Sequence, residues 1–323
     1  MDKRWRGVLA WPGEQGDAMN ELGLACLKRL QEWRTPAIEE FFLGVTRGGE
    51  GFWILAIAGT VFWLFGARIA YRMGFALATG DLLTGALKST FCVPRPWLRD
   101  PAILPVPEAQ YGAFGYSFPS GHAANTAVLW GGLAAAVRRW WLWVPALAWI
   151  GLMAFSRLVL GVHTPVDVAG SLLLAIPVVW GMGALYDWTE RNPDKRWTVL
   201  AGAVLVALAA WAFVRFKPMP EGSDPNFSKD AFRSVWGVLG FFWAWSFERK
   251  HVRYDPAKLG GYRIVAVAVG VLVLALMIDN LPRLLAPFLG LEIASYVLAA
   301  ANPVWIFVVW PFLLKGLEKP APR

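Results

Sequence analysis

The sequence is poor in charged residues and in cysteine. Only 17% of its 323 residues are charged, whereas soluble globular domains carry roughly 25%. The two cysteines, Cys26 and Cys92, allow one bridge at most and stand at no metal-ligand spacing. This composition excludes a soluble enzyme, a disordered protein and a disulfide-stabilised scaffold.

Apolar and aromatic residues are abundant instead. Hydrophobic residues make up 57% of the chain, and 20 residues are tryptophan. They form runs of about 13–21 residues, several long enough to enter or cross a bilayer once their flanks are counted. The pattern predicts an integral membrane protein of the all-α class, a polytopic transmembrane helical bundle of about nine spans. The predicted spans are Phe52–Ala67, Met73–Leu87, Ala123–Val137, Trp140–Phe155, Val166–Tyr186, Thr198–Phe213, Val235–Phe247, Ile264–Ile278 and Val297–Leu314.

The order of these spans predicts three parts. Residues 1–50 form an N-terminal amphipathic segment, residues 51–216 a core of six helices, and residues 217–323 a C-terminal extension of three spans. Within the first part, Asp17–Trp33 places apolar and charged residues at helical spacing, which suits a helix on the membrane surface or one docked on the bundle. Residues 1–32 lack an apolar core of signal-peptide length, so we expect no cleaved leader there.

The net charge of +8 is distributed unevenly between the two faces that nine spans would create. The loops of one face hold 15 basic residues and those of the other face nine, with the N-terminal segment left out. The positive-inside rule places the face with more basic residues in the cytoplasm. Because membrane orientation accounts for the positive charge, we expect no nucleic acid partner. The absence of a sorting signal and the many Ala, Trp and Arg residues favour a bacterial plasma membrane.

Three segments on the outward face contain residues suited to chemistry. They are Lys88–Pro96, Pro119–His122 and Ser156–Asp167, and they include two of the three histidines of the chain. A single cation at a membrane boundary is usually an anchor. Three cations, two histidines and a carboxylate on one face need a further explanation.

Helix starts in these segments suit an anion. Ser120, Gly121 and His122 open a span after a proline, so the first N–H groups and the helix dipole face whatever lies there. Asp167 lies in the first turn of the next such helix, where a carboxylate is favoured. It stands close enough to His163 to hold the ring in one tautomer and leave the other nitrogen free to attack.

The cations and the second histidine complete a site for a phosphoryl group. Lys88, Arg95 and Arg157 supply positive charge for its equatorial oxygens, the arginines in bidentate fashion. His122 is then left as the proton donor to the leaving oxygen.

The three segments resemble the signature of the type 2 phosphatidic acid phosphatase superfamily. The family pattern is K-x6-R-P, then P-S-G-H, then S-R-x5-H-x3-D, and the sequence matches every fixed position between Lys88 and Asp167. The resemblance implies a metal-independent hydrolase of a phosphomonoester or diphosphate, without cofactor, that forms a phosphohistidine. It implies that His163 is the nucleophile, Asp167 its helper and His122 the acid. The implied phosphate-binding residues are Lys88, Arg95, Ser120, Gly121 and Arg157.

Several readings of the substrate stay open. A nine-span layout is similar to that of the glucose-6-phosphatases, and the Pro-Arg-Pro segment and extra spans look like sphingosine-1-phosphate phosphatases; layout is a weak guide to substrate. We expect a lipid phosphate and membrane lipids as partners, because a site between helices receives lipids directly. A soluble sugar phosphate, a non-enzymatic phospholipid transporter and vanadate-dependent haloperoxidase chemistry are the alternatives. The sequence carries no signal of the head group or the oligomeric state.

Asp81 is a further carboxylate within a predicted span, seven residues before Lys88 and so on the same helical face. Carboxylates at such depth are costly and usually paired. Asp81 either supports the site through a cation or pairs with another helix.

Overall fold

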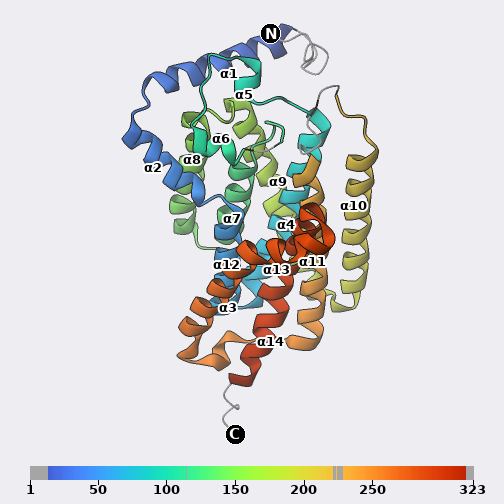
Figure 1. Cartoon of the computed structure of the whole chain (residues 1–323). Coiled ribbons are helices and arrows are strands. Elements are labelled where there is room, and N and C mark those ends of the chain that lie inside the picture. Colours follow the sequence, from blue (N-terminus) through green and yellow to red (C-terminus); the bar gives the residue numbers. More distant parts are fainter. Residues whose placement is uncertain (1–13, 114, 221–222, 224–227, 318–323) are drawn as a thin grey trace.

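The computed structural model describes residues 14–113, 115–220, 223 and 228–317, and within them it contains helices and no strand (Figure 1). The helices are α1 Glu14–Glu32, α2 Pro36–Arg47, α3 Gly51–Phe65, α4 Ala67–Phe91, α5 Pro96–Arg99, α6 Pro107–Tyr111, α7 Gly121–Val137, α8 Trp143–Val159, α9 Pro165–Arg191, α10 Arg196–Phe216, α11 Lys229–Phe247, α12 Tyr262–Leu289, α13 Leu291–Val304 and α14 Trp310–Leu314.

Each of the nine predicted apolar stretches is helical, but nine membrane spans are not confirmed. Five helices in the described residues are long and apolar enough to cross a membrane, or six if the bent pair α2–α3 counts as one span. The all-helical fold and the membrane location are therefore confirmed. The five are Trp140–Val159, Pro165–Arg191, Pro193–Phe216, Tyr262–Leu289 and Leu291–Leu317.

Three of the helices that fall short of this test, α4, α7 and α11, lie in the interior of the bundle. Helix α4 contacts α3, α7, α9, α10 and α11, and α11 also contacts α13. In contrast, α10 lies at one side (Figure 1) and, like α12, exposes large apolar side chains such as Leu205 and Ile264. A helix that is covered by protein needs less apolar surface than one that faces lipid. Position in the bundle thus explains the lower hydropathy of α4 and α11, whereas α7 falls short by length, with 17 residues.

The N-terminal segment is docked on the bundle, the second of the two alternatives for Asp17–Trp33. Helix α1 lies across the upper end in Figure 1 and contacts α8 and α9. Leu27 is 2% exposed, and the Lys28 ammonium lies 2.5 Å from the Asp100 carboxylate. The Gln31 side chain accepts from the Leu104 N–H at 2.8 Å. Residues 1–13 of the predicted N-terminal part lie outside the described residues.

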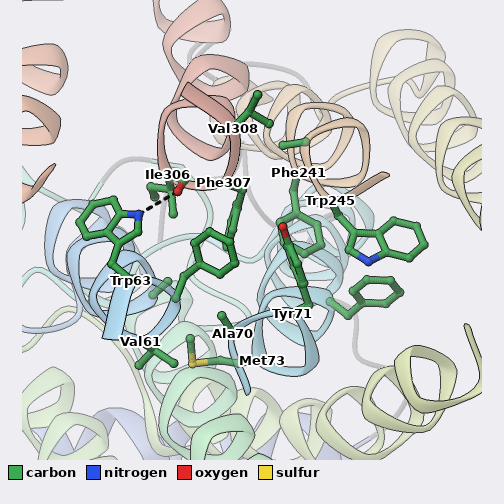
Figure 2. Close-up of a cluster of buried hydrophobic side chains, with 14 of the residues drawn as sticks. Val61, Trp63, Ala70, Tyr71, Met73, Phe241, Trp245, Ile306, Phe307 and Val308 are labelled. Carbon is green, nitrogen blue, oxygen red and sulfur yellow. Dashed lines mark hydrogen bonds between the residues drawn. The ribbon is translucent and has the colours of Figure 1, made fainter. Parts of the chain in front are cut away.

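The C-terminal helices share one hydrophobic core with the early helices (Figure 2). The Trp63 indole N–H of α3 donates to the Ile306 carbonyl at 2.9 Å. The ring centroids of Tyr71 and Phe307 lie 5.1 Å apart. The last helices therefore pack directly against α3 and α4, and the division of the chain at residue 217 stays a prediction.

Candidate active site

The three motif segments meet at the end of the bundle that α1 covers. Lys88 lies near the end of α4, Arg157 near the end of α8, and Asp167 in the first turn of α9. A Cβ added at Gly23 of α1 would lie 3.5 Å from the Thr164 side chain, which caps α9. Residues about 80 positions apart in the sequence thus converge under the N-terminal segment.

His163 lies between a cation and a carboxylate. The Nη1 atom of Arg95 lies 2.9 Å from Nε2 of His163, and Oδ2 of Asp167 lies 3.7 Å from Nδ1. A guanidinium only donates, so Nε2 is the acceptor and the ring proton is on Nδ1, facing Asp167. Because 3.7 Å is too long for a hydrogen bond, the carboxylate acts on the ring through its charge.

The environment of His163 keeps its ring neutral. The side chain is 2% exposed. Burial, and next the positive charge of Arg95, lower the pKa of His163 well below its ordinary value of 6.5. A neutral imidazole with a lone pair on Nε2 is the form that can act as a nucleophile.

Asp167 is held by its own helix cap and by a serine. The Thr164 N–H donates to Oδ2 of Asp167 at 2.7 Å, and the Thr164 hydroxyl accepts from the Asp167 N–H at 3.4 Å. These reciprocal bonds form the capping box at the start of α9. The Ser117 hydroxyl donates to the same Oδ2 at 2.7 Å. The carboxylate is therefore fixed before any substrate binds.

The three cations of the motifs are buried and are held mainly by oxygens without full charge. Nζ of Lys88 donates to the Tyr116 carbonyl at 2.6 Å. Nη1 of Arg95 donates to the Val162 carbonyl at 3.0 Å, and burial lowers the Arg95 pKa to about 10, still well above neutrality. Nη1 of Arg157 donates to the Thr46 hydroxyl, while its Nε has no partner among the described residues. Three buried cations beside the single carboxylate of the motifs make a site for an anion.

The start of α7 completes this site. The helix begins at Gly121, where a Cβ would meet no atom within 4 Å, and the Ser120 hydroxyl is buried without a partner in the described residues. The Ser120 N–H donates to the Asp167 carbonyl at 3.3 Å, which joins the second and third motifs. His122 is half-buried, in the first turn of α7. The structure thus brings together the eight residues expected from the sequence.

The structure adds contacts from residues that the sequence analysis did not place at the site. Thr46 holds Arg157, and a Cβ added at Gly49 would lie 3.0 Å from the His122 ring. No local pattern links these residues to motifs that lie more than 70 positions away. The Ser171 hydroxyl donates to the Ser120 and Asp167 carbonyls at 3.0 and 2.8 Å. The sequence signal for these hydrogen bonds was a serine in an apolar stretch, one helical turn after Asp167.

Asp81 pairs with another helix, which was the second of its two alternatives. Its Oδ1 accepts from the Asn125 amide of α7 at 3.3 Å, one turn after His122. No ion pair of Asp81 with a cation occurs in the part of the chain that the structure describes. Among the same residues, no three His, Cys, Asp or Glu side chains form a group that could hold a metal ion.

Comparison with known proteins gives matches to phosphatases. Lipid phosphate phosphatase delta of Arabidopsis thaliana is 25% identical over 223 residues, which cover 64% of this chain and 51% of that protein. A dihydrosphingosine 1-phosphate phosphatase of Schizosaccharomyces pombe is 24% identical over 204 residues, which cover 58% and 47%. The matched region spans about half the length of these curated relatives.

A solved structure and a family model also match. The crystal structure of a transmembrane PAP2-type phosphatidylglycerolphosphate phosphatase from Bacillus subtilis is 23% identical, with a TM-score of 0.45 over 53% of this chain and 87% of that one. Residues 69–193 match the model of the PAP2 superfamily. That segment contains all three motifs described above, so this part of the chain is similar to the PAP2 superfamily.

Proposed function

We propose that this protein is an integral membrane phosphatase that hydrolyses a phosphomonoester or diphosphate of a lipid through a phosphohistidine on His163. The observation that carries this proposal is the setting of the His163 ring. Its Nε2 faces the Arg95 guanidinium at 2.9 Å, and its Nδ1 faces the Asp167 carboxylate. The lone pair on Nε2 of His163 is thus adjacent to the Arg95 guanidinium, the cation that would bind the phosphate.

The reaction consists of two displacements at phosphorus. In the first, Nε2 of His163 forms a bond to phosphorus, the bond from phosphorus to the leaving oxygen breaks, and His122 gives that oxygen a proton. In the second, His122 takes a proton from water, the water oxygen attacks phosphorus, and the bond to Nε2 breaks to release phosphate. Lys88, Arg95 and Arg157 stabilise the charge on the equatorial oxygens in both steps.

These cations and the first turn of α7 supply the positive charge that a metal ion supplies in other phosphoryl-transfer enzymes. The proposal therefore includes a metal-independent reaction. Ser120 and Gly121 bring the helix start close to the phosphate, since Gly121 has no side chain and open space beside it. A phosphate oxygen would also satisfy the buried Ser120 hydroxyl and the Arg157 Nε–H.

A lipid phosphate is the substrate class that these observations favour. The site lies at the ends of α4, α8 and α9, beside helices that qualify as membrane spans. Such a position brings a lipid head group within reach while its chains stay in the bilayer. The names of the relatives, a lipid phosphate phosphatase and a dihydrosphingosine 1-phosphate phosphatase, agree with this choice.

The proposed orientation places the site on the extracytoplasmic side of a bacterial plasma membrane. The 15 basic residues of the predicted cytoplasmic face support it, against nine on the other face. Arg68, Arg138 and Arg191 of the richer face lie at the opposite ends of α4, α7 and α9 from the motifs.

Phosphate release by the purified, detergent-solubilised protein tests the function. The panel contains lipid phosphates and sugar phosphates, each measured with EDTA present, and the His163→Ala variant is the control for contaminating phosphatases. Release from lipid phosphates by the wild type alone is the expected result. Release from sugar phosphates alone would identify the alternative substrate class. If no substrate of the panel releases phosphate and the protein transfers lipid between vesicles, the protein is a transporter and the proposed enzymatic function is wrong.

A further inference from the structure

A second charged region lies at the end of the bundle opposite to the motifs. It surrounds a cavity of about 500 Å³. The cavity is lined by Arg68, Arg138, Tyr186, Asp187, Glu190, Arg191 and Arg249. We call it the distal cavity.

Two helices, α4 and α9, connect the distal cavity to the candidate active site and keep the two apart. Helix α4 carries Arg68 at its start and Lys88 near its end. Helix α9 carries Asp167 in its first turn and Arg191 as its last residue. At 1.5 Å per residue, these pairs are separated by about 30 and 36 Å along the helix axes. The distal cavity is therefore a separate site, close to the other surface of the membrane.

The carboxylates of the distal cavity are already paired with arginines. Oδ2 of Asp187 is shared by Arg72 and by Arg138, the latter at 3.2 Å. Glu190 pairs with Arg249 at 2.6 Å and lies 3.8 Å from Arg196.

Two further arginines leave a surplus of positive charge. Arg68 and Arg191 line the cavity, and neither makes an ion pair with a carboxylate in the described residues. The Arg191 Nε–H donates only to the neutral Asp187 carbonyl, at 3.2 Å. Four arginines and two carboxylates thus line the cavity, with Arg72, Arg196 and the buried Glu248 beside them, and the surplus of positive charge suits an anion.

Three buried side-chain atoms in the wall of the cavity have no hydrogen-bond partner in the described residues. They are the hydroxyl of Tyr186, whose residue is 1% exposed, Nε of Arg249, and Oε1 of Glu190, an acceptor that lies 3.8 Å from the Arg196 guanidinium. The Arg249 atom is a donor, and the Tyr186 hydroxyl can donate as well. A buried donor without an acceptor is costly, so the cavity suits a ligand that brings several acceptor oxygens. A phosphate group has such oxygens and pairs with guanidinium groups in bidentate fashion.

The position of the cavity indicates where this phosphate comes from. Trp188 and Trp197 lie beside it in the sequence and are exposed, as is typical of side chains at the head-group level of a bilayer. Basic pockets between the ends of membrane helices bind the head groups of anionic lipids. We propose that the distal cavity binds the phosphate of an anionic phospholipid from the leaflet opposite to the active site.

Lipid-dependent thermal stabilisation of the purified full-length protein tests this site. The protein in neutral detergent is titrated with phosphatidylglycerol, with phosphatidylcholine, or with inorganic phosphate, and the Tm is followed. We expect phosphatidylglycerol to raise the Tm with saturation and phosphatidylcholine to have little effect, because only the first carries a net negative charge. Inorganic phosphate should act weakly, since it lacks the chains that hold a lipid at the membrane surface.

Matched variants locate the effect. The double substitution Arg68→Gln and Arg191→Gln should raise the phosphatidylglycerol concentration for half-maximal stabilisation at least fivefold. Tyr186→Phe removes only the unpartnered hydroxyl, keeps the ring beside Phe75, and should raise it about twofold. Arg139→Gln is the control, because Arg139 is exposed and does not line the cavity. Arg95→Gln is a second control, which shows whether the lipid acts through the candidate active site.

Three outcomes would overturn the proposal. The first is equal stabilisation by phosphatidylglycerol and phosphatidylcholine. The second is a phosphatidylglycerol response that Arg95→Gln removes and the cavity variants leave unchanged. The third is saturation by inorganic phosphate alone, which would make the cavity a site for the free ion. If the double variant does not fold, the single Tyr186→Phe variant gives the same decision.

Discussion

The hydrogen bond from Arg157 to Thr46 offers a sharp test of how the N-terminal segment contributes to the candidate active site. Both residues are buried, and Nη1 of Arg157 donates to the Thr46 hydroxyl. Thr46→Val removes this acceptor and keeps the shape of the side chain. Arg157 would then lose the side-chain hydrogen bond that it makes within the described residues, at the position where we expect it to bind phosphate.

The size of the effect follows from the charge of the donor. Hydrogen bonds to charged groups contribute roughly 1.5–3 kcal/mol. Each 1.36 kcal/mol corresponds to a factor of ten in rate. If the guanidinium has to be reoriented in every catalytic cycle, kcat/KM of Thr46→Val should fall by about 10–100-fold.

The assay is phosphate release from a lipid phosphate at several substrate concentrations, with the Tm measured in parallel. Thr46→Ser is the matched control, because it retains the hydroxyl that accepts from Arg157. Its kcat/KM should stay within about threefold of the wild-type value, a difference of about 0.65 kcal/mol in activation free energy. A wild-type kcat/KM for Thr46→Val would refute the reasoning. Equal losses in the Val and Ser variants would also refute it, because the hydroxyl would then not be the group that matters.

Four further predictions concern the proposed reaction. His163→Ala should abolish both turnover and labelled phosphoenzyme, whereas His122→Ala should slow the reaction about 10²–10⁴-fold and be partly rescued by an activated ester; the reverse pattern would exchange the two roles. Because burial and the charge of Arg95 lower the pKa of His163, its protonation should reduce kcat/KM only well below pH 6.5, and Arg95→Gln should move this acidic limb to higher pH on the same substrate. Activity should persist in EDTA, and a loss that magnesium restores would contradict the metal-independent reaction. A reporter fused after Arg323 should behave as cytoplasmic, and a periplasmic signal would reverse the orientation.

The sequence predicted the residues of the candidate site because each motif is a short stretch around a helix end. Asp167 lies three residues after Thr164, and this spacing brings its carboxylate back to the N–H of Thr164, the N-cap residue of α9. Arg157 and His163 are held together across one tight loop, where the His163 N–H donates to the Arg157 carbonyl at 3.3 Å. The spacing of these residues in the sequence therefore predicted which of them meet, but not the distances between their atoms.

Sequence patterns could not predict the contacts that the N-terminal segment makes. Thr46 and Arg157 are 111 residues apart, and a threonine near a predicted span has many possible roles. Whether α1 lies on the membrane or on the bundle depends on tertiary packing, because an amphipathic helix has one apolar face that suits either environment. The burial of Leu27 and the ion pair of Lys28 with Asp100 separate the two cases.

The number of spans was uncertain for a related physical reason. Hydropathy reports what a helix exposes to lipid, and a central helix such as α4 exposes little. Asp81 and Lys88 are tolerated within α4 because Asn125 and the Tyr116 carbonyl provide polar partners from neighbouring segments. Polar residues therefore lower the hydropathy of the helix that carries the chemistry.

The basic residues used to infer orientation also have a structural role that their count does not convey. Arg72 and Arg138 come from different helices and meet at Asp187 of α9, while Arg249 joins Glu190 of the same helix. These ion pairs connect the ends of α4, α7 and α9, the same three helices that carry motif residues at their other ends. A phosphate bound in the distal cavity would strengthen these connections, because it would neutralise the surplus charge between the helix ends. The stability of the helices that carry the site would then depend on the lipid composition of the opposite leaflet.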